Sequence, residues 1–189
     1  MKFKTRRSYD TPGEAHELTF STYHRLPFLT LPGVAEAFVH ALERARHRLE
    51  FQVWAYVVMP EHCHVLLFPE AAEHSVAQIL RQIKAPVARQ AFALHPNLRP
   101  ATAVKRPSGR LEYRFWQQGG GYDRNISSGN VAWRSIEYIH HNPVERGLCA
   151  DARDWPWSSV RAHEGKAGIV EVVRCPWWAS ETRRAPGLG

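Results

Sequence analysis

The stretch FQVWAYVVMPEHCHVLLFP, residues 51–69, decides the fold of this chain. Its β-branched, aromatic and leucine residues predict two strands, Phe51–Met59 and His62–Pro69. Pro60 and Glu61 form a connection short enough to return the second strand beside the first. The stretch therefore predicts a buried antiparallel hairpin whose second strand opens with two histidines.

The triplet His62-Cys63-His64 carries the first indication of chemistry. Alternate side chains leave the same face of a strand, so His62 and His64 point together and Cys63 points away. Such a pair can clamp a metal ion. The other interpretation is a pair of buried histidines satisfied by hydrogen bonds, and the triplet alone does not separate the two.

Composition limits the class of partner. A chain of 189 residues with 44% hydrophobic residues predicts one packed domain. Its formal net charge of +7 favours polyanions, with nucleic acid first and an anionic membrane surface second. No apolar run reaches the ~20 residues that span a bilayer, and none resembles a signal peptide, so we expect no membrane partner and a cytoplasmic location. The three cysteines lack metal-type or disulfide spacing and receive no chemical role.

Periodicity predicts the elements on either side of the hairpin. A strand at His16–Tyr23 and an amphipathic helix at Leu31–Arg48 precede it. A second helix begins at a capping box of Ser75 and Gln78 and is expected to kink at Pro86.

The second half of the chain is predicted to add one strand and one helix. Residues 94–110 read as a loop, residues 111–117 as the fourth strand, and the glycines at 119–121 as a turn or hinge. A third helix covers about 130–141 and is expected to end before Pro143. The order β-α-β-β-α-β-α predicts an α+β fold, a ferredoxin-like antiparallel sheet with helices on one face, plus this later helix.

The third helix carries the second indication of chemistry. Arg134, Tyr138 and Asn142 are four residues apart and share a face that lies off the apolar stripe. A tyrosine can attack a phosphodiester if its proton is removed and the phosphate charge is neutralised, and a metal ion supplies the neutralisation. We prefer Asn142 as a third ligand beside the histidines, and Glu61, the alternative ligand, is expected to be solvated in its turn. Alone, Tyr138 could equally cover the edge of the core with its hydroxyl in water.

Together these residues resemble a known family, the HUH single-tyrosine transposases, and within it the REP-associated tyrosine transposases of bacteria. Four segments carry the resemblance: MPEHCHVLL at 59–67, FWQQGGGYDRN at 115–125, YIHHNPV at 138–144 with RGL at 146–148, and DWPWSS at 154–159. The usual middle residue of the histidine motif is bulky and apolar, and Cys63 departs from it only mildly.

The resemblance implies a catalytic domain at residues 1–163, and the sequence after His163 reads as a loosely specified tail at 164–189. It implies that His62 and His64 hold Mg²⁺ or Mn²⁺, that Asn142 completes the ligand set, and that Tyr138 is the nucleophile. It further implies cleavage and rejoining of single-stranded hairpin DNA through a 5′-phosphotyrosine link.

Positive charge and aromatic rings predict the DNA contacts. Each cation alone is explained equally well as a solvated charge, and each ring as part of the core. The candidates are Lys2, Lys4, Arg6, Arg7, Lys105, Arg106, Arg110 and Arg124 for phosphates, and Trp116 and Tyr122 for unpaired bases.

Two other functions compete with this interpretation, and the sequence argues against the first, which gives Tyr138 no role. A histidine-triad nucleotide hydrolase would need a third histidine where Leu66 stands. A domesticated protein that binds single-stranded DNA hairpins without cutting them would keep the same residues. The sequence also leaves the oligomeric state open between a monomer and a homodimer in which the third helix is exchanged.

Overall fold

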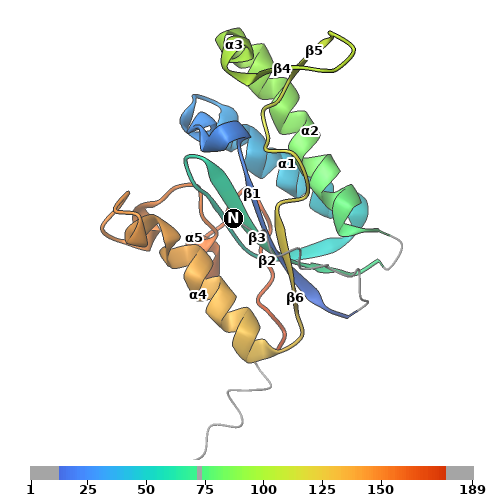
Figure 1. Ribbon diagram of the computed structural model, residues 1–189. Helices are drawn as coiled ribbons and strands as arrows, with labels where there is room; N and C mark the ends of the chain where they lie inside the picture. Colours follow the sequence, from blue (N-terminus) through green and yellow to red (C-terminus); the bar gives the residue numbers. More distant parts are fainter. Residues whose placement is uncertain (1–12, 72–73, 178–189) are drawn as a thin grey trace, which may run out of the picture.

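The computed structural model describes residues 13–71 and 74–177 (Figure 1). Its centre is a four-stranded antiparallel sheet in the order β2-β3-β1-β6. The strands are β1 (Ala15–Ser21), β2 (Phe51–Val58), β3 (His62–Pro69) and β6 (Tyr122–Ile126). The hairpin predicted from the sequence is confirmed as β2 and β3 at the first edge of this sheet.

Helices cover both faces of the sheet. The helices α1 (Val34–Leu49) and α2 (Val76–Leu94) pack together on one face, and α4 (Gly129–Glu145) lies on the other (Figure 1). The predicted α+β fold of ferredoxin-like type, with the tyrosine on an additional later helix, is confirmed. Among the described residues, no helix has both the length and the apolar character needed to cross a membrane.

The alternation along β3 divides its side chains between the two layers. Cys63, Val65 and Leu67 belong to the core beneath α1 and α2, and Leu66 belongs to the core beneath α4. His62 and His64 share the parity of Leu66, so both imidazoles lie on the α4 side of the sheet.

The fourth strand of the sheet differs from the sequence prediction. It is β6 at Tyr122–Ile126, whereas β5 (Leu111–Tyr113) pairs with β4 (Ala103–Lys105) in a separate two-stranded hairpin. The reason is burial, because Leu111 and Tyr113 are 54% and 42% exposed and supply no apolar face for the central sheet.

The predicted loop at 94–110 was also wrong in part, since it contains two short helices and β4. The remaining short elements are η1 (Tyr23–Arg25), η2 (Phe28–Thr30), η3 (Pro96–Leu98), α3 (Arg99–Thr102), η4 (Ala152–Asp154) and α5 (Val160–His163).

The helix α4 runs past the predicted end and contains Pro143. Proline lacks an N–H, so the carbonyl of Ile139 loses its usual partner four residues on. The helix continues beyond the proline, because the Arg146 amide donates to the Asn142 oxygen at 3.1 Å and the Leu148 amide donates to the Pro143 oxygen at 2.9 Å. The Pro143 ring is buried, and its packing offsets part of the lost bond.

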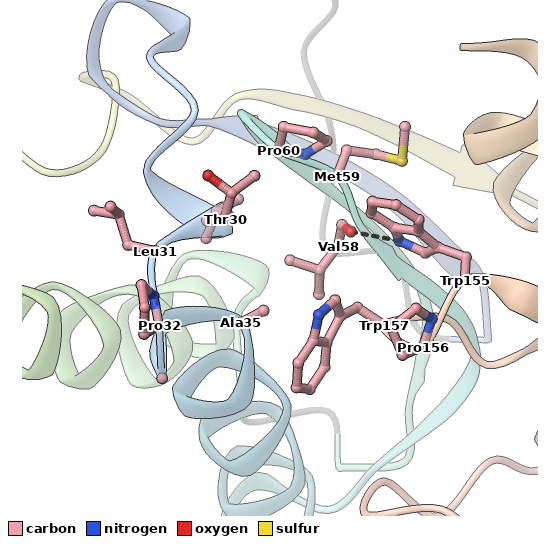
Figure 2. Close-up of a pocket in the computed structure, with 12 residues that line it drawn as sticks. Thr30, Leu31, Pro32, Ala35, Val58, Met59, Pro60, Trp155, Pro156 and Trp157 are labelled. Carbon is pink, nitrogen blue, oxygen red and sulfur yellow. Dashed lines mark hydrogen bonds between the residues drawn. The ribbon is translucent and has the colours of Figure 1, made fainter. Parts of the chain in front are cut away.

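A tryptophan-rich turn covers the outer edge of β2, as the aromatic segment predicted. The Val58 amide donates to the Trp157 oxygen at 2.8 Å, and the Trp155 indole donates to the Val58 oxygen at 2.9 Å (Figure 2). The indoles and the chain before α1, at Leu31 and Pro32, line a pocket of about 290 Å³ (Figure 2). Unpaired strand edges promote aggregation, and this turn occupies one such edge.

Part of the segment assigned to the tail packs on the same strand. The Val173 amide donates to the Val53 oxygen at 2.9 Å, and Val170 and Cys175 are buried. Residues 178–189 lie outside the described part of the chain.

Gly121 allows β6 to approach β1. Its φ is +85°, and a Cβ at this position would lie 2.1 Å from the Thr19 carbonyl oxygen. Gly119 has a similar φ of +95°, but no atom lies within 4 Å of its notional Cβ. A comparison of substitutions at Gly121 and Gly119 therefore distinguishes backbone strain with a steric clash from backbone strain alone.

We expect Gly121→Ala to destabilise the protein by about 3 kcal/mol and Gly119→Ala by about 1 kcal/mol. Both substitutions force a side chain into left-handed backbone space, and only Gly121→Ala adds a clash with β1. Urea unfolding of the two variants measures the difference. Equal losses of stability would contradict the close approach of the two strands.

Candidate active site

The two histidines of β3 meet through their ring nitrogens. The Nε2 atoms of His62 and His64 are 3.0 Å apart, and the rings are nearly perpendicular, at 85°. The side chains are buried, with 6% and 5% of each residue exposed. The pair therefore forms one compact site of two nitrogen donors.

A neighbouring side chain orients each ring through its Nδ1 atom, while the Nε2 atoms face each other. His62 Nδ1 lies 3.0 Å from Glu61 Oε1, and His64 Nδ1 lies 2.8 Å from Thr19 Oγ1. An ionised carboxylate only accepts, so His62 carries its proton on Nδ1 and presents the lone pair of Nε2 to the site. A hydroxyl both donates and accepts, so Thr19 can hold His64 in either tautomer.

Both imidazoles favour the neutral form that metal ligation requires. Burial, the charge of the neighbouring His62 and the charge of Arg25 lower the pKa of His64 to about 3. Burial also lowers the pKa of His62, although the Glu61 carboxylate acts in the opposite direction.

Glu61 was expected to be solvated in the turn, and that expectation was wrong. It is 7% exposed, because the chain after β1 closes over the β2–β3 connection, where Thr22 donates to the Glu61 oxygen and Leu29 of η2 donates to the Pro60 oxygen. Its Oε1 accepts hydrogen bonds from Arg146 Nη1 at 2.8 Å and from Arg25 Nη2 at 3.0 Å. Burial raises the pKa of Glu61, but the hydrogen bond and charge of Arg146 and the hydrogen bond from His62 outweigh it and lower the pKa to about 2. The carboxylate is thus ionised beneath the histidines.

The helix α4 brings the tyrosine to this site. The Tyr138 ring lies 5.4 Å from the His64 ring, centroid to centroid, and the residue is 45% exposed. Two turns later, Arg146 reaches Glu61. Asn142 lies between these two contacts on the same helical face and is 5% exposed. The structure therefore brings Tyr138 beside the histidine pair and places Asn142 one helical turn further along the same face of α4.

The donor set suits a hard or borderline divalent ion. Two nitrogens bound to one ion at right angles, at the usual metal–nitrogen distance, lie about 3 Å apart, which matches the histidine pair. The described residues contain no cluster of three His, Cys, Asp or Glu side chains that could hold a metal. The two imidazole nitrogens are therefore the donors that the described geometry brings together.

The predicted DNA contacts separate into three groups. Lys2, Lys4, Arg6 and Arg7 lie outside the described residues. Lys105, Arg106 and Arg110 are exposed on the β4–β5 hairpin, which Figure 1 shows far from α4, and Arg106 pairs with Glu112. Tyr122, Arg124 and Trp116 lie on or beside the central sheet.

Of the two aromatic candidates, only Tyr122 is accessible. Trp116 is 8% exposed, donates its indole N–H to the Lys84 oxygen and packs against Phe20, so its faces are not available to bases. Tyr122 is 43% exposed and lies directly across from Thr19, which lies directly across from His64. Directly opposed residues share a face of the sheet, so Tyr122 lies on the face of the histidine site.

Arg124 is held inside a polar network beneath α4. Its Nη2 donates to Glu17 Oε2 at 2.5 Å and to Ser135 Oγ at 2.9 Å. The Ser135 hydroxyl donates to the same Glu17 oxygen at 2.8 Å. Glu17 is 6% exposed and needs this compensation. Arg124 therefore joins β6, β1 and α4, a role that competes with phosphate binding.

A known protein family matches the part of the chain that contains these residues. The model of the IS200-like transposase family matches residues 15–142, which is more than half of the chain. The chain belongs to this family. The match begins with β1 and ends at Asn142, so it contains the histidine pair, the tyrosine and the proposed amide ligand.

Two curated relatives of the family carry a more specific description. The REP-associated tyrosine transposase of Escherichia coli K12 is 25% identical over 120 residues, which cover 64% of this chain and 61% of that protein. A Haemophilus influenzae relative with the same type of description is 25% identical over 122 residues, 65% of this chain and 66% of its own. The chain thus matches less than two thirds of each relative's length.

A solved structure confirms the fold. The REP-associated tyrosine transposase bound to a REP hairpin aligns with a TM-score of 0.67 at 21% identity, covering 90% of this chain and 92% of that chain. The family resemblance inferred from the four sequence segments is confirmed by these matches.

The structure adds three residues that the sequence reasoning missed as parts of the site. Thr19 and Arg146 received no role, and Glu61 was considered only as a rival ligand. The signal available in the sequence was weak, because each residue acts through a partner on another element.

We expect Arg124→Ala to destabilise the protein by about 2 kcal/mol, because it leaves the buried Glu17 carboxylate without its cation. This figure is reduced for the partial exposure of the arginine. Arg110→Ala, which removes an exposed arginine, should change stability by less than about 0.5 kcal/mol. Urea unfolding of both variants tests the assignment, and equal stabilities would contradict a structural role for Arg124.

Proposed function

We propose that this member of the IS200-like family cleaves and rejoins single-stranded DNA, with Tyr138 as the nucleophile and Mg²⁺ or Mn²⁺ bound by His62, His64 and Asn142. One observation carries the proposal, namely the position of the Tyr138 ring against the His64 ring at the mouth of a buried pair of Nε2 donors. A tyrosine that only covered the core would not need this partner.

The ligands have separate roles in holding the ion. His62 and His64 supply neutral nitrogens whose direction is set by Glu61 and Thr19, and Asn142 supplies an amide oxygen without adding negative charge. When bound, the ion neutralises a non-bridging phosphate oxygen and so lowers the barrier to attack. Fixing the donors in advance avoids reorganisation when the phosphate arrives.

The exposed phenol of Tyr138 can reach an extended strand laid over the site. Its oxygen attacks phosphorus and loses its proton, and the bond from phosphorus to the 3′ oxygen breaks. The 3′ oxygen takes up a proton and leaves as the 3′-hydroxyl of the upstream strand. The phosphate at the 5′ end of the downstream strand remains joined to the Tyr138 oxygen. The reverse attack by a 3′-hydroxyl restores the phosphodiester and the free phenol, so rejoining needs no nucleotide cofactor.

The substrate class rests on three further observations. The structural neighbour with the same fold is bound to a REP hairpin. In this chain, Tyr122 lies exposed on the face of the histidine site, and the formal net charge of +7 favours a polyanion. We therefore propose single-stranded DNA with a hairpin as the partner.

The arrangement of one chain supports action in cis. Tyr138 and His64 are in contact within one chain, which is the arrangement that cleavage by a monomer requires. A homodimer that exchanges α4 would bring the same two residues together from different chains, and a solution mass measured with and without DNA distinguishes the two states.

Tyr138→Phe should abolish covalent capture of a labelled hairpin oligonucleotide while leaving its binding within about threefold. Tyr113→Phe, which alters another exposed tyrosine, should leave capture unchanged. Denaturing gels detect the adduct, and gel-shift titrations measure binding. An adduct on the Tyr138→Phe protein would overturn the nucleophile, and binding without cleavage on every hairpin tested would favour a non-cleaving DNA-binding protein.

His62→Ala and His64→Ala should each weaken Mn²⁺ binding by more than about 100-fold, because each removes one of two nitrogen donors. Cys63→Ala lies on the same strand but the opposite face, so its Mn²⁺ affinity should stay within about threefold. Electron paramagnetic resonance titration of free Mn²⁺ reports affinity without any DNA. Cleavage that persists in excess chelator would remove the metal from the mechanism.

A further inference from the structure

A single carboxylate oxygen joins three elements of the structure beside the histidines. Glu61 Oε1 accepts hydrogen bonds from His62 Nδ1 on β3 at 3.0 Å, from Arg25 Nη2 on η1 at 3.0 Å and from Arg146 Nη1 at the end of α4 at 2.8 Å. The backbone oxygen of Glu61 also accepts from the Thr22 amide and hydroxyl, at 2.9 Å and 3.1 Å. Glu61 is thus immobilised at both its backbone and its side chain.

The C-terminal turn of α4 needs a contact from outside the helix, because its own hydrogen-bond ladder is interrupted. Pro143 removes one bond of the helical ladder, and Asn142 lies in the weakened turn immediately before it. Arg146 is the C-terminal cap of the helix, where a cation also interacts favourably with the helix dipole. Its ion pair with Glu61 spans 85 residues of sequence and attaches this turn to β3.

We infer that the Glu61–Arg146 ion pair is a clasp that sets the position of α4, and hence of Asn142 and Tyr138, relative to the two histidines. This inference rests on the proposed function for its catalytic consequence. Glu61 and Arg146 are positioning residues, because neither touches the reacting atoms.

The shared oxygen couples the two halves of the site. Removing the Glu61 charge disturbs both the orientation of His62 and the attachment of α4. Removing Arg146 releases only α4, since His62 keeps its carboxylate partner. Removing Arg25 takes away a cation bound to the same oxygen but leaves both contacts in place. The three residues therefore provide a matched set of variants.

Amide hydrogen exchange tests the clasp in the protein without metal or DNA. The amides of residues 146–148 are hydrogen-bonded at the end of α4. We expect them to exchange about tenfold faster in Arg146→Ala and in Glu61→Gln, and within about twofold of the wild-type rate in Arg25→Ala and Arg146→Lys. Unchanged exchange in Arg146→Ala, or equal acceleration in Arg25→Ala, would overturn the clasp.

Metal binding and covalent capture then test its consequence. Glu61→Gln should weaken Mn²⁺ binding 10- to 100-fold, the usual effect of losing a group that orients a ligand. Arg146→Ala should slow adduct formation at least tenfold at saturating Mn²⁺, and Arg146→Lys should recover most of the rate. Faster exchange with an unchanged adduct rate would overturn the positioning role and leave the proposed function intact. If the wild type forms no adduct, the proposed function fails, and the exchange and Mn²⁺ measurements still decide the clasp.

Discussion

The alternation of side chains along β3 is the constraint on which the rest of the site depends. It sends Cys63 into the core beneath α1 and α2 and sends His62 and His64 toward α4. A shift of register by one residue would bury both imidazoles in the apolar layer and expose the thiol to the site. The apolar neighbours on both faces fix that register, so core packing and the geometry of the site are specified together.

The site is a buried polar region in which each group is oriented by a partner from another element. Thr19 on β1 holds His64, Glu61 holds His62, and Arg146 on α4 holds Glu61. Ionised and neutral groups coexist because burial favours neutral imidazoles, while the hydrogen bond and charge of Arg146 keep the Glu61 carboxylate ionised. Preorganisation of this kind suits an ion that must bind two nitrogens and still accept a phosphate oxygen.

A comparison of the predicted and observed helices and strands shows which of them the local sequence pattern is sufficient to predict. The hairpin at 51–69 and the capping box at Ser75 were predicted correctly, since each depends on residues close in sequence. The fourth strand was misplaced, because residues 111–117 contain strand-forming side chains but bury only the last part of the segment. The end of α4 was misplaced because buried packing around Pro143 offsets its local penalty.

The sequence by itself determined the fold class through its strand and helix periodicities, and the family resemblance through its four motif segments. It also singled out His62, His64, Tyr138 and Asn142 as candidate site residues. Only the tertiary structure decided that Glu61 is buried, that Arg146 and Thr19 complete the site, and that Trp116 belongs to the core. These facts depend on contacts between elements far apart in the chain. Such contacts are set by sheet register and helix packing, which no local pattern of side chains encodes.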